Sequence, residues 1–161
     1  MKATKFAGIL AIIGGIIMVI AGIGTYAMVS SQLSAENITV PDDSPMLPGA
    51  HVSGPFSAYA QAEIIQVHAL KISDGKTYAE LGELANAAKD AGDKELAEKL
   101  TGQRATIMNA SFLRASLFTS VVAFGVAALV IGLGVLFAVV GWALMVIGKA
   151  HAEDDVVKAS A

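Results

Sequence analysis

Two long uncharged stretches restrict what this chain can fold into more than any other feature. The first covers 30 residues, 6–35, and the second covers 34 residues, 115–148, and neither contains Asp, Glu, Lys, Arg or His. A helix needs about 20 apolar residues to cross the ~30 Å hydrocarbon core of a bilayer, so each stretch is long enough for a membrane span. The chain is 55% hydrophobic and only 16% charged, whereas soluble domains have about 25% charged residues. This pattern excludes an ordinary soluble enzyme.

The basic residues that flank the two stretches predict a topology. Lys2 and Lys5 precede the first stretch, and Lys149 follows the second. Lys and Arg next to a span favour the cytoplasmic side of the membrane. We therefore expect both termini in the cytoplasm and residues 31–113 outside the cell membrane. A cleaved signal peptide is the alternative for the N-terminus, but its apolar core is only about 7–15 residues long.

The predicted fold class is an all-α membrane protein: an antiparallel two-helix transmembrane hairpin with a small, mainly helical extracytoplasmic domain. The expected parts are a cytoplasmic N-terminus (1–5), transmembrane helix 1 (6–30), the extracytoplasmic domain (31–113), transmembrane helix 2 (114–148) and a disordered cytoplasmic tail (149–161). At ~1.5 Å per residue, 34 residues form about 51 Å of helix. Helix 2 is therefore expected to begin before the bilayer and to project from it.

Within the extracytoplasmic domain, proline separates a loop from a helical part. All four prolines lie in residues 41–55, which predicts a loop there, and 57–112 is expected to be helical. Side chains suited to capping mark three helix starts: Ser57, Thr77 with Glu80 as a capping box, and Asp93. The third helix is expected to end near Leu100, before Gly102.

Glycine recurs every seven residues in both stretches, and this is the most specific pattern in the sequence. The first stretch contains Gly8, Gly15 and Gly22; the second contains Gly134, Gly141 and Gly148, with Gly125 and Gly132 as a further pair. A seven-residue period keeps one stripe facing a partner helix, and small residues let the backbones approach closely. The pattern predicts a helix-packing interface, whose partner is either the other helix of the chain or another membrane protein.

The remaining sequence contains no motif for catalysis or metal binding. Cysteine is absent, so disulfides and thiolate metal sites are excluded. His151 lies on the opposite side of the membrane from His51 and His68 in the predicted topology, and no catalytic motif occurs. We therefore expect no enzyme activity, no catalytic residue, no metal and no cofactor. The sequence contains no basic patch of the kind that binds nucleic acids, so we expect no nucleic-acid partner. The alternating charges of 89–100 indicate a solvated face or an electrostatic docking surface.

Three segments carry a family resemblance: GTYAMVSSQL (24–33), GPFSAYAQAEIIQVHAL (54–70) and MNASFLRASLFTSVVAFGVAAL (108–129). They resemble a family of small actinobacterial two-span membrane proteins. Members of that family often carry the label "aromatic ring-opening dioxygenase", which these residues do not support, because no iron-binding triad is present. Such proteins are similar to the accessory two-helix subunit of the mycobacterial respiratory supercomplex of cytochrome bcc and the aa3 oxidase.

The resemblance implies a function in electron transport without catalysis. It implies an accessory subunit that stabilises or regulates the supercomplex, with membrane lipid and components of cytochrome bcc and the aa3 oxidase as partners. No catalytic residue carries over from the family. The alternative is a binding or signalling protein of the cell envelope, whose extracytoplasmic domain recognises a ligand.

Overall fold

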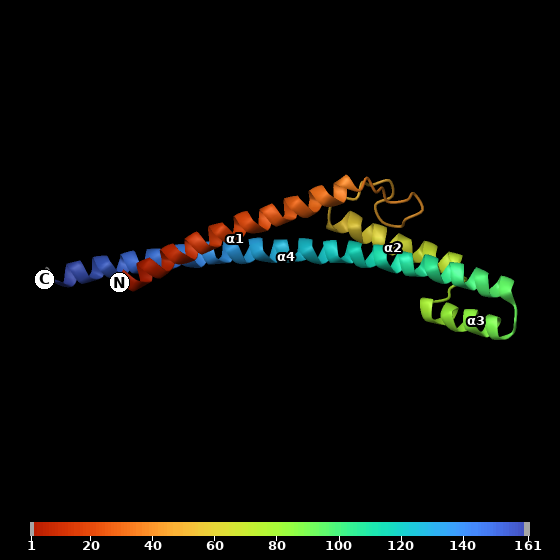
Figure 1. Ribbon diagram of the computed structural model, residues 1–161. Helices are drawn as coiled ribbons and strands as arrows, with labels where there is room; N and C mark the ends of the chain where they lie inside the picture. The colour runs from red at the N-terminus through yellow and green to blue at the C-terminus, as the bar shows by residue number, and fades with distance from the viewer. Residues whose placement is uncertain (1, 160–161) are drawn as a thin grey trace. The chain divides into compact units, whose positions relative to one another are not determined.

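Four helices make up most of the chain in the computed structural model, which describes residues 2–159. In chain order they are α1 (Lys2–Ala35), α2 (Pro55–Ile72), α3 (Tyr78–Asp90) and α4 (Lys94–Ala159) (Figure 1). Between these limits there is no β-strand, although one isolated antiparallel bridge joins Thr39 to His51. The predicted all-α class is therefore confirmed.

The chain divides into two compact units. We call residues 2–29 with 123–159 the helix-pair unit and Ser30–Val122 the middle unit. The helix-pair unit contains parts of α1 and α4, whereas α2 and α3 belong to the middle unit. Each unit therefore has its own packing, and each is described separately.

Helices α1 and α4 are long and apolar enough, by length and composition, to cross a membrane. A core helix of a soluble protein passes the same test, but most of such a helix is buried by its own chain. Only 17% of the most apolar window of each helix is buried here. Exposed side chains include Phe6 at 64%, Ile20 at 65% and Leu129 at 61%. These side chains do not form a core of the chain, and an apolar environment is needed to cover them.

The proline-containing segment of the middle unit forms a closed loop. The backbone N–H of Val40 donates to the Ala50 carbonyl at 2.9 Å, and that of Val52 donates to the Ile38 carbonyl at 2.9 Å. Both valines are buried, at 1% and 0% exposure. These two hydrogen bonds pair the two short extended pieces, and no helix begins between Ala35 and Pro55.

The predicted N-cap of α2 is wrong. The helix begins at Pro55 and Gly54 is its N-cap, whereas Ser57 lies in the first turn. Proline suits the first helical position because its φ angle is already helical and it lacks an N–H that would remain unpaired. The Ser57 hydroxyl still serves the helix start, since it accepts hydrogen bonds from the backbone N–H groups of Ser53 and Gly54, both at 3.1 Å.

The capping box predicted for α3 is confirmed. The backbone N–H of Thr77 donates to Glu80 Oε2 at 2.7 Å, and the backbone N–H of Glu80 donates to Thr77 Oγ1 at 3.4 Å. The hydrogen bond from the Thr77 backbone, followed by that from its hydroxyl, lowers the pKa of Glu80. The ionised Glu80 side chain therefore stabilises the start of α3.

The lowered pKa of Glu80 makes the stability of α3 sensitive to acid. Its contribution is fully present above the ordinary glutamate pKa of about 4.3 and is lost as pH falls through the lower folded value. Glu80→Gln should therefore weaken the decrease in thermal unfolding temperature that occurs below about pH 4.3. The control is Glu83→Gln, an exposed position in the same helix. Parallel pH profiles for wild type and the Glu80 variant would contradict this prediction.

Helix α4 does not end before Gly102, contrary to the prediction. Asp93 does cap its start, because Leu96 N–H donates to Asp93 Oδ1 at 3.0 Å. The helix then continues without interruption for 66 residues. A glycine inside a helix costs about 1 kcal/mol, and burial of Leu100 and Ile107 on either side of Gly102 offsets this cost.

Helix α4 also covers most of the tail, 149–161, that was predicted to be disordered. The helix ends at Ala159. Neither glycine nor proline occurs after Gly148, so no residue there breaks the backbone pattern. The side chains from 150 onward lie outside the described residues, and they include His151.

One hydrophobic cluster of the middle unit is small and contains mainly alanine. Its buried members come from three helices: Ala69 of α2; Leu81, Ala85 and Ala88 of α3; and Ala97, Leu100 and Ile107 of α4. A polar contact adds to this core, because the Arg104 guanidinium lies over the Tyr78 ring at 4.0 Å from its centroid. Leu81, at 0% exposure, is the largest α3 side chain in the cluster.

Candidate functional site

Close backbone contact in the helix-pair unit occurs at the glycines of the seven-residue pattern. A Cβ atom added to Gly8 would lie 2.7 Å from the Gly141 carbonyl oxygen, and one added to Gly134 would lie 2.6 Å from the Gly15 oxygen. Real Cβ atoms do not approach other atoms so closely. The α1 and α4 backbones therefore touch at these positions only because side chains are absent.

The contacts of the helix-pair unit follow an antiparallel register. Gly8 faces Gly141, Gly15 faces Gly134, and a Cβ on Gly22 would lie 2.9 Å from the Ala127 oxygen. Each step of seven residues forward in α1 corresponds to seven residues backward in α4. Gly148 is in ordinary contact only, with side-chain atoms of Thr4 and Lys5 at 3.7 Å. The structure thus brings five of the six predicted glycines into tight contact and places the sixth at the looser end.

The second glycine pair of α4 has a different environment. A Cβ on Gly125 or Gly132 would meet no atom within 4 Å, and both residues are exposed. The same spacing therefore occurs on two stripes of α4, of which only one contacts α1. The absence of side chains at Gly125 and Gly132 would allow a further helix to approach the other stripe closely.

Aromatic side chains lie at two levels of the helix-pair unit. Tyr26 packs on Phe124, with ring centroids 4.7 Å apart, and Phe124 is only 2% exposed. Trp142, by contrast, is 65% exposed. It lines an apolar groove of about 400 Å³ together with Ile16 and Ala138, among other residues of α1 and α4. The groove and the exposed aliphatic side chains suit lipid chains or an apolar helix.

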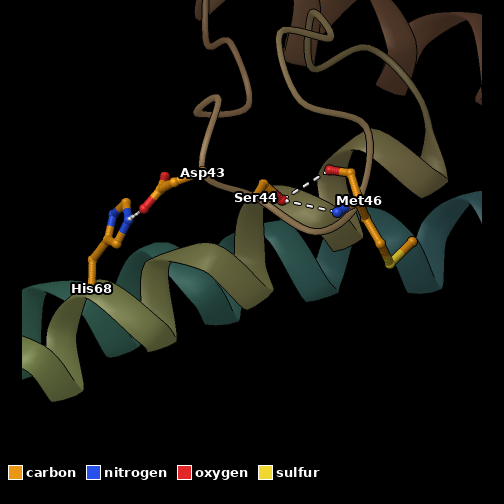
Figure 2. A network of polar contacts seen from close by, with 4 residues as sticks. All are labelled: Asp43, Ser44, Met46 and His68. Atoms are coloured by element: carbon orange, nitrogen blue, oxygen red, sulfur yellow. Dashed lines mark hydrogen bonds and ion pairs between the residues drawn. The ribbon is translucent and has the colours of Figure 1, made fainter.

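In the middle unit, the loop is held to α2 by a pair that the sequence did not predict. His68 Nε2 lies 2.8 Å from Asp43 Oδ2, and Figure 2 shows the two side chains facing each other across the gap between the loop and the helix. The hydrogen bond from His68 lowers the pKa of Asp43. Because the side chains are 40% and 55% exposed, the pair contributes little free energy. It orients the loop without burying charge.

Ser44 fixes the turn beside this pair. Its hydroxyl donates to the Met46 carbonyl at 2.8 Å and accepts from the Met46 backbone N–H at 3.3 Å (Figure 2). The serine is only 6% exposed. These local bonds explain why Asp43 is presented to His68 in a defined position.

The histidines do not assemble a metal site in the described part of the chain. No group of three His, Cys, Asp or Glu residues there is placed to hold a metal ion. His51 takes part in the bridge to Thr39, and His68 pairs with Asp43. The side chain of His151 lies outside the described residues.

Arg114 connects α2 to α4 in the middle unit. Its Nε donates to the Ala62 carbonyl at 3.0 Å, and its Nη2 lies 3.6 Å from Glu63 Oε1. The guanidinium also lies 5.5 Å from the centroid of the Phe118 ring. Arg114 directly precedes the second uncharged stretch, so this contact fixes α2 on the last charged turn of α4 before that stretch.

The chain matches no family model, and neither a curated protein nor a solved structure is significantly similar to it. Its function must therefore be argued from the residues and contacts described above. The features that stand out are close-packed helices, an apolar exposed surface and a middle unit that carries most of the charged residues.

Proposed function

We propose that this chain is a two-pass protein of the cell membrane. Two helices of sufficient length and apolar character support the proposal, and so does the small buried share of those helices. Both termini are then cytoplasmic, and residues 31–113 are extracytoplasmic. The basic residues at the ends of the stretches support that orientation. Glycine contacts between α1 and α4 favour an antiparallel transmembrane hairpin.

Within the membrane, the protein acts as a non-catalytic accessory or assembly subunit of the actinobacterial respiratory supercomplex. Its partners are membrane lipid and components of cytochrome bcc and the aa3 oxidase. The observation that carries this function is the use of one glycine stripe between α1 and α4, which leaves the Gly125–Gly132 stripe without a neighbour within 4 Å. In lipid, close packing of small residues is a main source of helix association, so a free stripe suits docking on a larger membrane protein.

The accessory function that we propose depends on the rigidity of the hairpin and not on a catalytic group. A hairpin held by backbone contacts presents its outer faces in a fixed geometry, so the hairpin itself loses less conformational freedom on binding a partner. The resemblance in 24–33, 54–70 and 108–129 supports the choice of the supercomplex as the partner.

Co-purification tests this function. A tagged chain isolated from mycobacterial membranes in mild detergent should retain the haem absorbance of cytochromes b, c and a. Gly132→Leu should reduce that absorbance, because the added side chain occupies the free stripe. Gly24→Leu is the control, since Gly24 also has no neighbour within 4 Å but lies on α1. A tagged chain without haem absorbance would reject the supercomplex as partner.

A second function is favoured by a different observation, a partly enclosed cavity of about 390 Å³ in the middle unit. This volume lies within the range of small-molecule sites, about 300–1,000 Å³. A binding or signalling protein of the cell envelope would use such a site. Native mass spectrometry that found a bound small molecule, but no cytochrome partner, would favour this function over the first.

A further inference from the structure

The cavity in the middle unit combines apolar walls with a few polar groups. It lies where the second half of α2, the start of α3 and residues 107–114 of α4 meet. Leu70 and Ile107 are among its apolar lining residues, and Gln66, Ser111 and Arg114 are among its polar ones. Small-molecule sites commonly have this composition, because apolar walls supply affinity and a few polar groups fix orientation.

Arg114 is the only charged residue in the lining of this cavity, and its hydrogen-bonding capacity is largely unused. A guanidinium has five N–H donors, and in the described part of the chain one of them makes a hydrogen bond, from Nε to Ala62. The distance of 3.6 Å to Glu63 is too long for a strong hydrogen bond. Glu63 itself does not line the cavity. Because Glu63 holds Nη2 only at this longer distance, a carboxylate in the cavity can compete for the terminal nitrogens, and its two oxygens match the guanidinium geometry.

The single positive charge in the lining of the cavity matches a monoanion. A phosphate or a dicarboxylate would bring a second negative charge, for which the lining has no cationic partner. The side-chain amide of Gln66 can donate to one oxygen beside the guanidinium, and it adds no charge. The partly exposed Leu70, next to the buried Ile107, offers an apolar wall to the body of the ligand.

We propose that the cavity between α2, α3 and α4 binds a small aliphatic carboxylate. The carboxylate pairs with Arg114, and the hydrocarbon chain lies between Leu70 and Ile107. This site does not depend on the supercomplex function, since it uses residues of the middle unit alone. If the chain did not co-purify with cytochromes, the proposal of a carboxylate site would still stand. If no carboxylate bound, the supercomplex function would still stand.

Photolabelling of the full chain in lipid nanodiscs tests the site. The probe is hexanoate that carries a diazirine on its chain, and the labelled peptides are identified by mass spectrometry. We expect labels on residues 66–79 and 107–114, competed by hexanoate but not by 1-hexanol, which has the same chain without the charge. Arg114→Gln should reduce the labelling about tenfold or more, because a hydrogen bond to a charged group is lost.

Two further variants separate binding from folding. Glu63→Gln should increase labelling, since it removes the carboxylate that competes for Arg114, and no structural loss produces an increase. Ser111→Leu should abolish labelling by filling the cavity while Arg114 remains in place. Labels spread over the stretches 6–35 and 115–148, equal competition by 1-hexanol, or labelling unchanged by Arg114→Gln would each overturn the proposal.

Discussion

Replacement of Gly15 by leucine should separate α1 from α4 in the helix-pair unit. The first atom of the new side chain would collide with the Gly134 carbonyl oxygen and would lie 2.9 Å from the Ala138 backbone nitrogen. Both obstacles are backbone atoms, which cannot move aside as a flexible side chain does. Overpacking in a well-packed core costs about 1–3 kcal/mol, and a backbone collision places this substitution at the upper end of that range or above it.

The separation can be measured with engineered cysteines, because the chain has none of its own. Tyr26→Cys and Phe124→Cys replace two rings whose centroids are 4.7 Å apart, so a short thiol cross-linker should join them efficiently. Gly15→Leu in that background should lower the cross-linking yield severalfold and reduce the thermal unfolding temperature in detergent.

Gly14→Leu is the matched control for this experiment. It places the same side chain one residue away, where a Cβ would meet no atom within 4 Å. The control should retain both the cross-link and the unfolding temperature. Equal effects of the two substitutions would mean that leucine disturbs α1 itself and that the glycine contacts do not hold the unit together.

The packing stripe could be predicted because the seven-residue spacing and the small size of glycine can both be read from the sequence. Three glycines per stretch at a spacing of seven identify a stripe, and the stripe needs a neighbour. The sequence could not decide which of two stripes on α4 faces α1, because Gly125 and Gly132 have the same spacing as Gly134 and Gly141. Only the register between the helices separates them, and the register depends on many side chains together.

Local capping could be predicted where one side chain decides it, as for Thr77 with Glu80. The start of a helix could not be predicted in this way where backbone geometry determines it. The helix α2 therefore begins at Pro55, and Ser57 is not its N-cap. The break expected at Gly102 failed for a related reason. A local cost of about 1 kcal/mol is smaller than the gain from burying Leu100 and Ile107, and that burial depends on α3.

Contacts over long sequence distances were beyond prediction. Asp43 and His68 are 25 residues apart, and the loop between them must fold before they meet. The carboxylate nearest to His68 in sequence, Glu63, is paired instead with Arg114. The cavity beside Arg114 has the same origin, since three helices must pack before it exists.

The second large effect is expected in the middle unit, where Leu81→Ala should release α3. Leu81 has 0% exposure and is the largest α3 side chain in a cluster composed mainly of alanine. Truncation of a buried leucine to alanine costs about 2–5 kcal/mol. The surrounding alanines cannot extend into the space that is left, so the loss should lie in the upper half of that range.

Amide hydrogen exchange gives the measurement, because it reports α3 separately from the rest of the chain. Residues 78–90 should exchange much faster in the Leu81→Ala variant, while the helix-pair unit should remain protected, because its packing does not include Leu81. Leu84→Ala removes the same atoms from the same helix at a position that is 41% exposed, and it should change stability by less than about 1 kcal/mol. Similar exchange in both variants would show that burial of Leu81 does not hold α3 on α4. In that case the contact between Arg104 and Tyr78 would be left as the main link between the two helices.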